Sequence, residues 1–272
     1  MGLLDRGIEI KRPEQIDGMR KAGLVVGNTL ELLRATVRAG ITTGELDGVA
    51  EDNIRTSGAT PSFLGYQGFP GSICTSVNDE VVHGIPGDRV LADGDVLSID
   101  CGAIVDGWHG DAAITVAIGV VPTEVTDLMR VTEEAMWRGI AAARLGGRVT
   151  DISHAVESHV RSAGGYGILE DYVGHGIGSE MHQPPNVPNF GRPGRGPRLV
   201  EGLALAVEPM ITLGGKDTVL LDDDWTVVTA DGTWAAHSEH TFTLTPTGTW
   251  VLTALDGGER ALAALGVPFG GR

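Results

Sequence analysis

The sequence predicts an α/β (α+β) fold made of two similar halves. Two observations lead to this fold class. First, segments with helical periodicity are followed by Gly- and Pro-rich stretches that contain short, β-branched runs. Second, this succession of helices and then strands occurs twice along the 272 residues. Because no repeat at the level of single residues accompanies it, the two halves are inferred from the order of the elements alone.

The first half opens with two predicted helices. Apolar residues recur at helical spacing from about Pro13, and Gly40 marks the expected end of that helix. Thr43 is the expected N-cap of the second helix, with Glu45 in its first turn. The runs SICTSV, DVLSID and AAITVAIG, which lie between positions 61 and 119, then predict strands.

The second half repeats this order. Helices are predicted over about 124–143 and 151–163, and a Gly/Pro-rich strand region follows over about 174–252. We therefore expect one domain over residues 8–255, with halves of about 13–122 and 123–255. Residues 256–272 are expected to form a C-terminal tail that contains a short helix near 259–265.

Composition narrows the function classes. A formal net charge of −16 argues against extended contact with DNA or RNA phosphates. The only two cysteines, Cys74 and Cys101, form neither a C-x-x-C pair nor a disulfide framework, which favours a reducing compartment. No apolar run is long enough to span a membrane, and the start of the chain is too charged for a signal peptide. We therefore expect a cytoplasmic protein.

Two aspartates in the segment DVLSIDCGAIVDGWHGD suggest a shared cation. Two predicted strands flank a turn near Asp106 and Gly107, and the period-two alternation of strands places Asp100 and Asp111 on one face. The two lie directly opposite or diagonally, depending on the turn. Carboxylates this close repel each other unless a cation lies between them. The alternative is that Asp100 caps a strand and Asp111 belongs to a turn.

Two histidines lie in the irregular segment YVGHGIGSEMHQPP. Glycines on both sides of His175 disfavour a regular helix, and His182 follows seven residues later beside a proline-rich stretch. A lone histidine in a loop is usually a surface residue or a hydrogen-bonded core residue. Two in one such segment favour a metal-ligand or acid–base role.

Two glutamates interrupt predicted apolar strands. In GLALAVEPMIT the alternation places Glu208 on a face otherwise lined by alanines. In AAHSEHTFTLTP it places Glu239 on the same face as His237 and Thr241. A carboxylate inside an apolar strand is costly without a partner. Pairing with a basic residue is the alternative to a metal site.

Together, these four carboxylates and one imidazole predict an oxygen-rich metal site. Such a set suits a pair of Co, Mn, Fe or Zn ions about 3.5 to 4 Å apart, and Mg also fits. Thiolate-bound zinc is excluded because the cysteines are too few. The sequence contains no H-E-x-x-H motif, no G-x-S-x-G elbow and no P-loop. The pattern therefore indicates a dimetal hydrolase.

Five segments resemble, in this order, the signature segments of the type I methionine aminopeptidases: NDEVVHGIP, LSIDCGAIVDGWHGD, GHGIGSEMHQPP, AVEPMI and SEHTFTLTPTG. The resemblance extends over about residues 8–255 and covers nearly the whole chain. It implies the pita-bread fold, in which two pseudo-symmetric α/β halves enclose a central site. It also implies removal of the initiator methionine from nascent proteins whose second residue is small and uncharged.

The resemblance further implies a role for each residue of the metal site. Asp100 would bind one ion, and His175 and Glu208 the other. Asp111 and Glu239 would bridge both ions. A hydroxide between the ions would attack the first peptide bond, and Glu208 would transfer the proton.

Two more histidines and a pocket follow from the same resemblance. His83 and His182 would donate hydrogen bonds to the scissile peptide and stabilise the oxyanion. The methionine side chain would occupy a shallow apolar pocket, for which plain core packing is the alternative reading of each residue: Phe63, Tyr66, Phe69, Cys74, Met181 and Trp225. Departures from some family members at Phe63, Gln67 and Val82 bear on fine specificity and leave the metal ligands intact.

Chain length narrows the subfamily. Only 25 residues separate His182 from Glu208, and no additional helical block of the type II kind appears before Glu239. Because no N-terminal extension is visible either, we expect the short bacterial form. The alternatives are an Xaa-Pro aminopeptidase-like hydrolase, which usually carries a separate N-terminal domain, and a non-catalytic binding protein of the same fold, which would lack ligands.

The expected partners are nascent polypeptide N-termini, with neither DNA nor a membrane, and family precedent indicates a monomer. Four basic residues stand out near the start of an acidic chain: Lys11, Arg12, Arg20 and Lys21. Because nascent chains are processed beside ribosomal RNA, transient ribosome contact through these residues is a hypothesis. A solvated helix face is the alternative.

Overall fold

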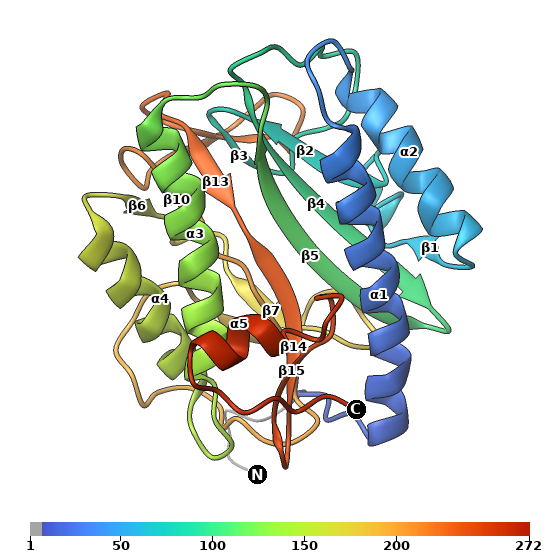
Figure 1. The fold of residues 1–272 in the computed structure, drawn as a ribbon, viewed down its shortest axis with the longest axis vertical. Coiled ribbons are helices and arrows are strands. Elements are labelled where there is room, and N and C mark those ends of the chain that lie inside the picture. Colours follow the sequence, from blue (N-terminus) through green and yellow to red (C-terminus); the bar gives the residue numbers. More distant parts are fainter. Residues whose placement is uncertain (1–6) are drawn as a thin grey trace.

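The computed structural model describes residues 7–272. Helices α1 (Pro13–Thr36) and α2 (Thr43–Thr56) precede a first group of strands, and helices α3 (Thr123–Ala142) and α4 (Val149–Ala163) precede a second group. Figure 1 shows the two helix pairs on either side of the molecule, with the long strands β5 and β14 visible between them. Helices are thus followed by strands in each half of the chain, which is the order that the sequence predicted.

The central sheet contains nine strands of the described chain. They are β1 (Thr60–Pro61), β2 (Ile73–Val77), β4 (Val96–Val105), β5 (Trp108–Ala117), β7 (Gly174–Gly176), β8 (Gln183–Val187), β9 (Ala204–Val207), β14 (Glu239–Thr245) and β15 (Gly248–Val251). Their order is β1-β4-β5-β14-β9-β7-β8, with β2 beside β4 and β15 beside β14. The antiparallel pairing of β5 with β14 therefore joins strands from the two parts of the chain.

In the described part of the chain, residues 7–272, two three-stranded sheets and two short helices complete the fold. One sheet has the order β13 (Ala235–His237), β10 (Met210–Thr212), β6 (Gly167–Ile168), and the other β11 (Thr218–Leu220), β12 (Val227–Thr229), β3 (Glu80–Val82). The short helices are the 3-10 helix η2 (Tyr66–Gly68) and α5 (Glu259–Ala264). Within residues 7–272, no helix is long and apolar enough to cross a membrane.

The start of α2 differs by one residue from the prediction. Thr42, not Thr43, is the N-cap: its hydroxyl accepts a hydrogen bond from the Glu45 backbone N–H, and the Glu45 carboxylate accepts one from the Thr42 backbone N–H. Thr43 instead uses its hydroxyl to bind the backbone of Gly87. The sequence distinguishes the two adjacent threonines, because only Thr42 is followed three residues later by a glutamate, Glu45, as a capping box requires.

Each helix pair packs on its own apolar cluster. Helices α1 and α2 contribute Val26, Leu33 and Leu46 to a cluster with Leu97 and Ile99 of β4. Helices α3 and α4 contribute residues such as Leu128, Ile140 and Ile152 to a second cluster with strands of the later part of the chain. Helices α1 and α3 thereby cover the same face of the sheet, on either side of its β5–β14 seam.

The four basic residues near the start of the chain do not form one exposed patch. Lys11 is buried, and the Arg20 guanidinium donates hydrogen bonds to the carbonyl oxygens of Leu252 and Ala254 at 2.7 and 2.6 Å. Arg12 and Lys21 are exposed. Any ribosome contact through this region would therefore depend on Arg12 and Lys21.

Candidate metal centre and active site

The structure brings all thirteen predicted site residues together around one cavity of about 250 Å³. The cavity is lined by the side chains of Phe63, Tyr66, Gln67, Phe69, Cys74, His83, Asp100, Asp111, His175, Met181, His182, Glu208, Trp225 and Glu239. Acidic residues and histidines make up one part of this lining, and aromatic and sulfur-containing side chains make up the other.

The two aspartates come from the β4–β5 hairpin. Asp106 and Gly107 have φ of 51° and 81°, and the flanking Val105 pairs with Trp108, so the turn contains two residues in the left-handed conformation. In this register Gly102 pairs with Asp111, which makes Asp100 and Asp111 diagonal neighbours on one face. The tighter of the two turns considered from the sequence is therefore the one present.

His175 lies in β7, between two glycines that the packing requires. A Cβ atom at Gly174 would lie 2.3 Å from the carbonyl oxygen of Ala206, and one at Gly176 would lie 2.2 Å from that of Pro184. The His175 Nδ1 atom lies 3.0 Å from the Gly176 carbonyl oxygen, so it carries the proton and donates it there. Nε2, 3.3 Å from Oε1 of Glu208, is then left with a free lone pair that faces the acidic residues.

The two glutamates lie at the ends of strands. Glu239 is the first residue of β14 and pairs with Ala113 of β5. Glu208 was expected inside a strand, but β9 ends at Val207 and β10 begins at Met210, so Glu208 follows the strand instead. Pro209 explains this break, because it has no N–H to donate to a sheet ladder.

Ligand atoms of two groups of residues lie within 4.8 Å of one another: Asp111, His175 and Glu239 form one, and Glu208, His237 and Glu239 the other. His237 was not predicted as part of the metal site. Its Nε2 lies 3.9 Å from both Glu208 Oε2 and Glu239 Oε2, and its side chain is buried. The signal was present in the sequence, since strand alternation placed His237 on the face of Glu239.

The electrostatics of this cluster fit a cation. Burial, together with repulsion between the carboxylates, raises the pKa values of Asp111, Glu208 and Glu239 well above their usual range, and burial raises that of Asp100 to about 7. Burial also lowers the pKa of His175 to about 3, which keeps the imidazole neutral. No lysine or arginine lines this cavity among the described residues.

Several polar atoms in the cluster lack a hydrogen-bond partner within the described chain. They are Oδ1 of Asp100, Oδ1 of Asp111, Oε1 of Glu239 and Nε2 of His237, all buried. An unpaired buried carboxylate oxygen is strongly unfavourable. Divalent ions would satisfy the three carboxylate oxygens among these atoms, and the carboxylates together with the imidazole of His175 are a ligand set for Mn, Fe, Co or Zn.

His83 and His182 lie beside the acidic cluster. His83 has φ of 61°, a conformation that non-glycine residues seldom adopt and that often marks a functional position. Its ring contacts Trp225 and Tyr172 edge-on, with centroids 6.2 and 5.5 Å away. The His182 ring lies 4.4 Å from that of His175, and its Nδ1 is 2.9 Å from the Tyr66 hydroxyl.

The apolar part of the cavity is a cluster of its own. Phe63, Phe69, Cys74 and Met181 are buried there, with Tyr66, Ile85 and Trp225 packed against them. The rings of Phe69 and Trp225 meet edge to face at a centroid distance of 5.0 Å. An apolar recess therefore adjoins a cluster of carboxylates and histidines, which suits a substrate with an apolar side chain next to a polar reacting group.

Comparison with known proteins agrees with this geometry. The family described as "Metallopeptidase family M24" matches residues 17–246. The chain belongs to metallopeptidase family M24. It is 52% identical over 247 residues to a methionine aminopeptidase of Clostridium acetobutylicum. The aligned region covers 90% of this chain and 98% of that protein. It is 53% identical over 245 residues to methionine aminopeptidase 1 of Mycobacterium tuberculosis, across 88% of this chain and 92% of that one.

Solved structures place this M24 chain with the methionine aminopeptidases. The methionine aminopeptidase of Rickettsia prowazekii superimposes with a TM-score of 0.88 at 40% identity, over 90% of this chain and 99% of that one. The prolidase of Pyrococcus furiosus gives a TM-score of 0.72 at 21% identity and is matched over only 65% of its length. The pita-bread fold is thus confirmed, and the Xaa-Pro peptidases share that fold at a greater distance.

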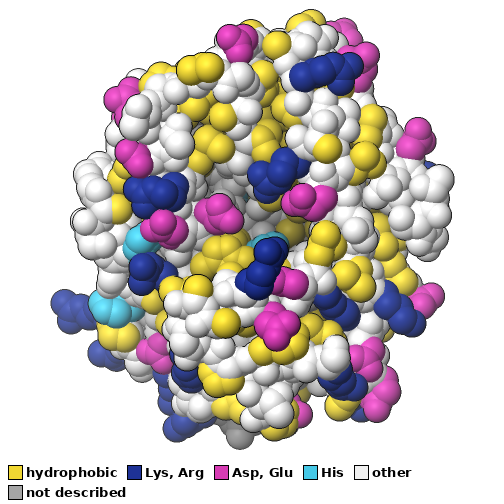
Figure 2. Space-filling view, viewed as in Figure 1, with side chains coloured by type: hydrophobic (Ala, Val, Ile, Leu, Met, Phe, Trp, Pro, Cys, Tyr) yellow, Lys and Arg dark blue, Asp and Glu magenta, His cyan; other side chains and the backbone are white. Residues whose placement is uncertain are grey.

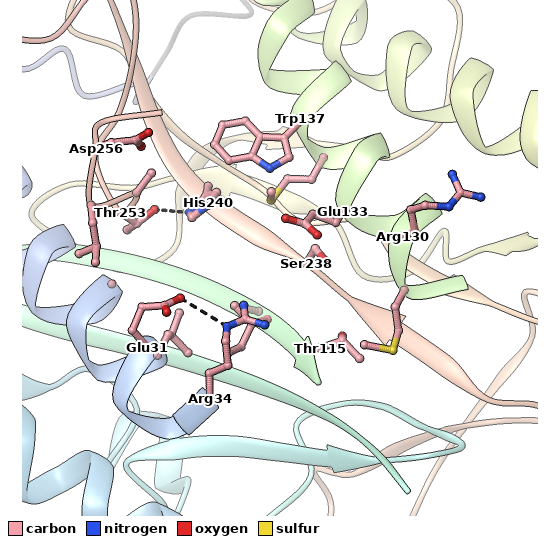
Figure 3. Close-up of a pocket in the computed structure, with 18 of the residues that line it drawn as sticks. Glu31, Arg34, Thr115, Arg130, Glu133, Trp137, Ser238, His240, Thr253 and Asp256 are labelled. Atoms are coloured by element: carbon pink, nitrogen blue, oxygen red, sulfur yellow. Dashed lines mark hydrogen bonds and ion pairs between the residues drawn. The ribbon is translucent and has the colours of Figure 1, made fainter. Parts of the chain in front are cut away.

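The M24 chain has a second cavity, of about 680 Å³, on the other side of the central sheet. Glu239 lines the smaller cavity and His240 the larger, because successive residues of a strand face opposite sides. Figure 2 shows this hollow on the face that carries α1 and α3, and Figure 3 shows Arg34 beside Glu31 and His240 beside Thr253 in its lining.

The arginines around this larger cavity already have carboxylate partners. Its three arginines form ion pairs with residues three or four positions away in the chain: Arg34 with Glu31, Arg130 with Asp127 and Glu134, and Arg260 with Asp256. None of the thirteen predicted site residues is among its lining residues. The smaller cavity is therefore the candidate active site.

Proposed function

We propose that this chain hydrolyses the first peptide bond of nascent proteins and releases their N-terminal methionine when the second residue is small and uncharged. The observation that carries the proposal is one small cavity in which four carboxylates and His175 adjoin a separate apolar recess. Relatives that are 52% and 53% identical and bear the name methionine aminopeptidase support it.

The metal site of this proposal consists of Asp100, Asp111, His175, Glu208 and Glu239. These residues would hold two divalent ions, which we infer to be Co, Mn, Fe or Zn, with Asp111 and Glu239 assigned to both ions. Glu239 belongs to both groups of close ligand atoms, and Asp111 belongs to one. When bound, such ions supply Lewis acidity and lower the pKa of a coordinated water to near neutrality. The buried carboxylate oxygens without a protein partner support this assignment.

The remaining steps belong to side chains of the chain itself. When the Tyr66 hydroxyl donates to Nδ1 of His182, Nε2 carries the proton and can donate to the scissile carbonyl oxygen. His83 is assigned the second hydrogen bond to the scissile peptide. Glu208, adjacent to His175 and His237, would accept the proton of the attacking water and pass it to the leaving amine.

The apolar recess accounts for methionine. An unbranched thioether side chain adapts to an irregular apolar surface and makes favourable contacts between sulfur and aromatic rings. The pocket residues of the proposal are Phe63, Tyr66, Phe69, Cys74, Met181 and Trp225. A cavity of about 250 Å³ holds little beyond this side chain and the scissile peptide, which restricts the second residue to small ones.

We place this activity in the cytoplasm, on nascent polypeptide N-termini, with the chain acting as a monomer. Transient ribosome contact would fall to the exposed Arg12 and Lys21. Unchanged co-sedimentation with ribosomes after charge reversal at these two residues would exclude it.

The test is release of free methionine from Met-Gly-Met-Met and Met-Leu after chelation and resupply of Co, Mn, Fe or Zn. We expect metal-dependent release from the first peptide alone, reduced at least about 100-fold in Asp111→Asn. The matched control is Asp106→Asn at the tip of the same hairpin, where asparagine tolerates the left-handed φ and activity should persist. Hydrolysis of Xaa-Pro peptides without release of methionine from Met-Gly-Met-Met would favour the Xaa-Pro aminopeptidase-like alternative. If no peptide is hydrolysed, a non-catalytic binding protein would be favoured.

A further inference from the structure

The segment before α1 contacts the loop that carries His182. This loop, residues 177–182, joins β7, which contains His175, to β8, and it also carries Met181 of the apolar recess. Glu9 does not line the cavity, yet its side chain lies against the loop. Nothing in the proposed chemistry uses Glu9, so its contacts need another explanation.

The Glu9 carboxylate accepts hydrogen bonds from Ser179, inside this loop, and from Gln183, the first residue of β8. Oε2 accepts from the backbone N–H of Ser179 at 3.1 Å and from Nε2 of Gln183 at 2.9 Å. Oε1 accepts from the Ser179 hydroxyl at 2.9 Å. The Ser179 hydroxyl also accepts from Gln183 Nε2 at 3.2 Å, so the three side chains form a closed network.

Lys11 also belongs to this network, through contacts with Glu9 and Gln183. Its Nζ lies 3.5 Å from Oε2 of Glu9 and donates to Oε1 of Gln183 at 3.4 Å, and its side chain is only 1% exposed. The Lys11 backbone is fixed by a hydrogen bond from its N–H to the Gly202 carbonyl oxygen at 2.8 Å. Burial raises the pKa of Glu9, but the hydrogen bonds from Ser179 and Gln183 outweigh it and hold that pKa below its usual value.

The fit between segment and loop leaves no spare room. A Cβ atom at Gly178 would lie 2.2 Å from Oε2 of Glu9 and 2.3 Å from Cε of Lys11. Elsewhere the loop is held mainly in its first residues: the Ile177 N–H donates to the Ala204 carbonyl oxygen at 3.2 Å, and the Gly178 N–H donates to the Glu180 carbonyl oxygen at 3.0 Å. The His109 N–H donates to the Gly178 carbonyl oxygen at 2.9 Å, and the strands that flank the loop pair irregularly, at Gly174–Val187 and Gly176–Gln183.

We propose that Glu9 is a positioning residue for the reaction: by tying Ser179 to Gln183 it fixes loop 177–182 so that His182 and Met181 face the metal centre and the methionine recess. The inference rests on the proposed role of His182. His182 directly precedes Gln183, so a loop freed from Glu9 would displace the imidazole while its hydrogen bond to Tyr66 remains as a flexible tether. A displacement of about 1 Å is enough to lower the rate substantially.

The experiment measures kcat and KM for Met-Gly-Met-Met with saturating Mn in Glu9→Ala and Glu9→Gln. Gln keeps the shape of Glu9 but presents an amide donor to groups that are themselves donors, so both variants should lower kcat about tenfold and change KM less than about threefold. Mn affinity should stay close to that of the parent chain, and kcat is compared well below the melting temperature of each variant, because Glu9→Ala leaves the buried Lys11 without its ion-pair partner. The matched control is Glu51→Ala, which removes an ion pair with Arg55 on α2 and should leave kcat unchanged.

A double-mutant cycle with His182→Ala separates positioning from general stabilisation. If Glu9 acts through His182, Glu9→Ala should cause no further loss of kcat in the His182→Ala background. An equal loss in both backgrounds, or full activity of Glu9→Ala beside an impaired His182→Ala, overturns the inference while the proposed function stands. Full activity of His182→Ala would instead remove the role assigned to His182, and the inference with it.

Discussion

Lys11 is a buried cation whose charge state affects stability. Burial lowers its pKa to about 8, while attraction to Glu9 opposes the shift. In the unfolded chain the pKa of a lysine is about 10.4. Between these two values the unfolded chain binds more protons than the folded one, so the contribution of Lys11 makes folding more favourable as pH rises through this window.

The prediction is a pH-dependent difference between the parent chain and Lys11→Met. The parent chain should gain up to about 3 kcal/mol of unfolding free energy relative to the variant between pH 7.5 and pH 10.5, because only the parent contains the titrating amine. Urea unfolding at both pH values measures it. A difference between the two proteins that stays constant with pH would show that Lys11 keeps its ordinary pKa and remains charged in the fold.

For single residues, the sequence predicted many of the side chains that the structure brings together at the candidate site. Period-two alternation was enough to put Asp100 and Asp111 on one face, but not to choose their register, which depends on the two-residue turn at Asp106. His237 was missed because a histidine two residues from a glutamate is common on any strand. Glu9 was beyond sequence reasoning, since its partners Ser179 and Gln183 are 170 and 174 residues away.

Helix α1 packs closely against β5 and the segment after β15, because glycines lie at the points of contact. A Cβ atom at Gly23 would lie 2.1 Å from the Leu252 carbonyl oxygen, and one at Gly110 of β5 would lie 2.7 Å from the Gly23 nitrogen. Both obstacles are backbone atoms and cannot rotate away. Gly48 of α2, in contrast, has no atom within 4 Å of the corresponding position.

Two glycine-to-alanine substitutions should therefore have opposite effects. Helix propensity alone favours alanine by about 1 kcal/mol in either helix, so Gly48→Ala should stabilise the chain by about that amount. Gly23→Ala should destabilise it by roughly 2 to 4 kcal/mol, because α1 must move away from the segment after β15. Urea unfolding of both variants decides the matter, and stabilisation by Gly23→Ala would mean that α1 is not held this closely.

Element boundaries show where sequence reasoning stops. Helix α1 ends at Thr36, although Gly40 was the expected end, because Val37 already adopts an extended ψ of 128°. Helix α4 begins at Val149, two residues before the predicted start, with the Asp151 side chain accepting from the Arg148 backbone N–H. In both cases the backbone conformation or a side-chain cap sets the end of the helix, and the apolar pattern does not specify it.

For the whole molecule, the candidate ligands come from both parts of the chain. Asp100 and Asp111 lie on the β4–β5 hairpin, and His175, Glu208 and Glu239 lie on later strands. The two parts meet in the sheet at β5–β14, where only Glu239–Ala113 and His240–Ala112 pair. Four clustered carboxylates at this short seam repel each other, so ions bound there would replace a repulsion with a link between the two parts.

Chelation should therefore lower the melting temperature of the whole chain rather than affect activity alone. An ion that binds only the folded chain, at about 100 times its dissociation constant, stabilises it by about 2.7 kcal/mol, which corresponds to about 5 to 10 °C for a chain of this size. Differential scanning calorimetry with EDTA and then with excess Mn measures the shift. In Asp111→Asn the shift should fall below half, because one ligand is gone and one negative charge of the seam is already removed. Equal shifts in both proteins would place the stabilising ion elsewhere in the molecule. If the parent chain melts at the same temperature with and without Mn, protons alone relieve the repulsion at the β5–β14 seam.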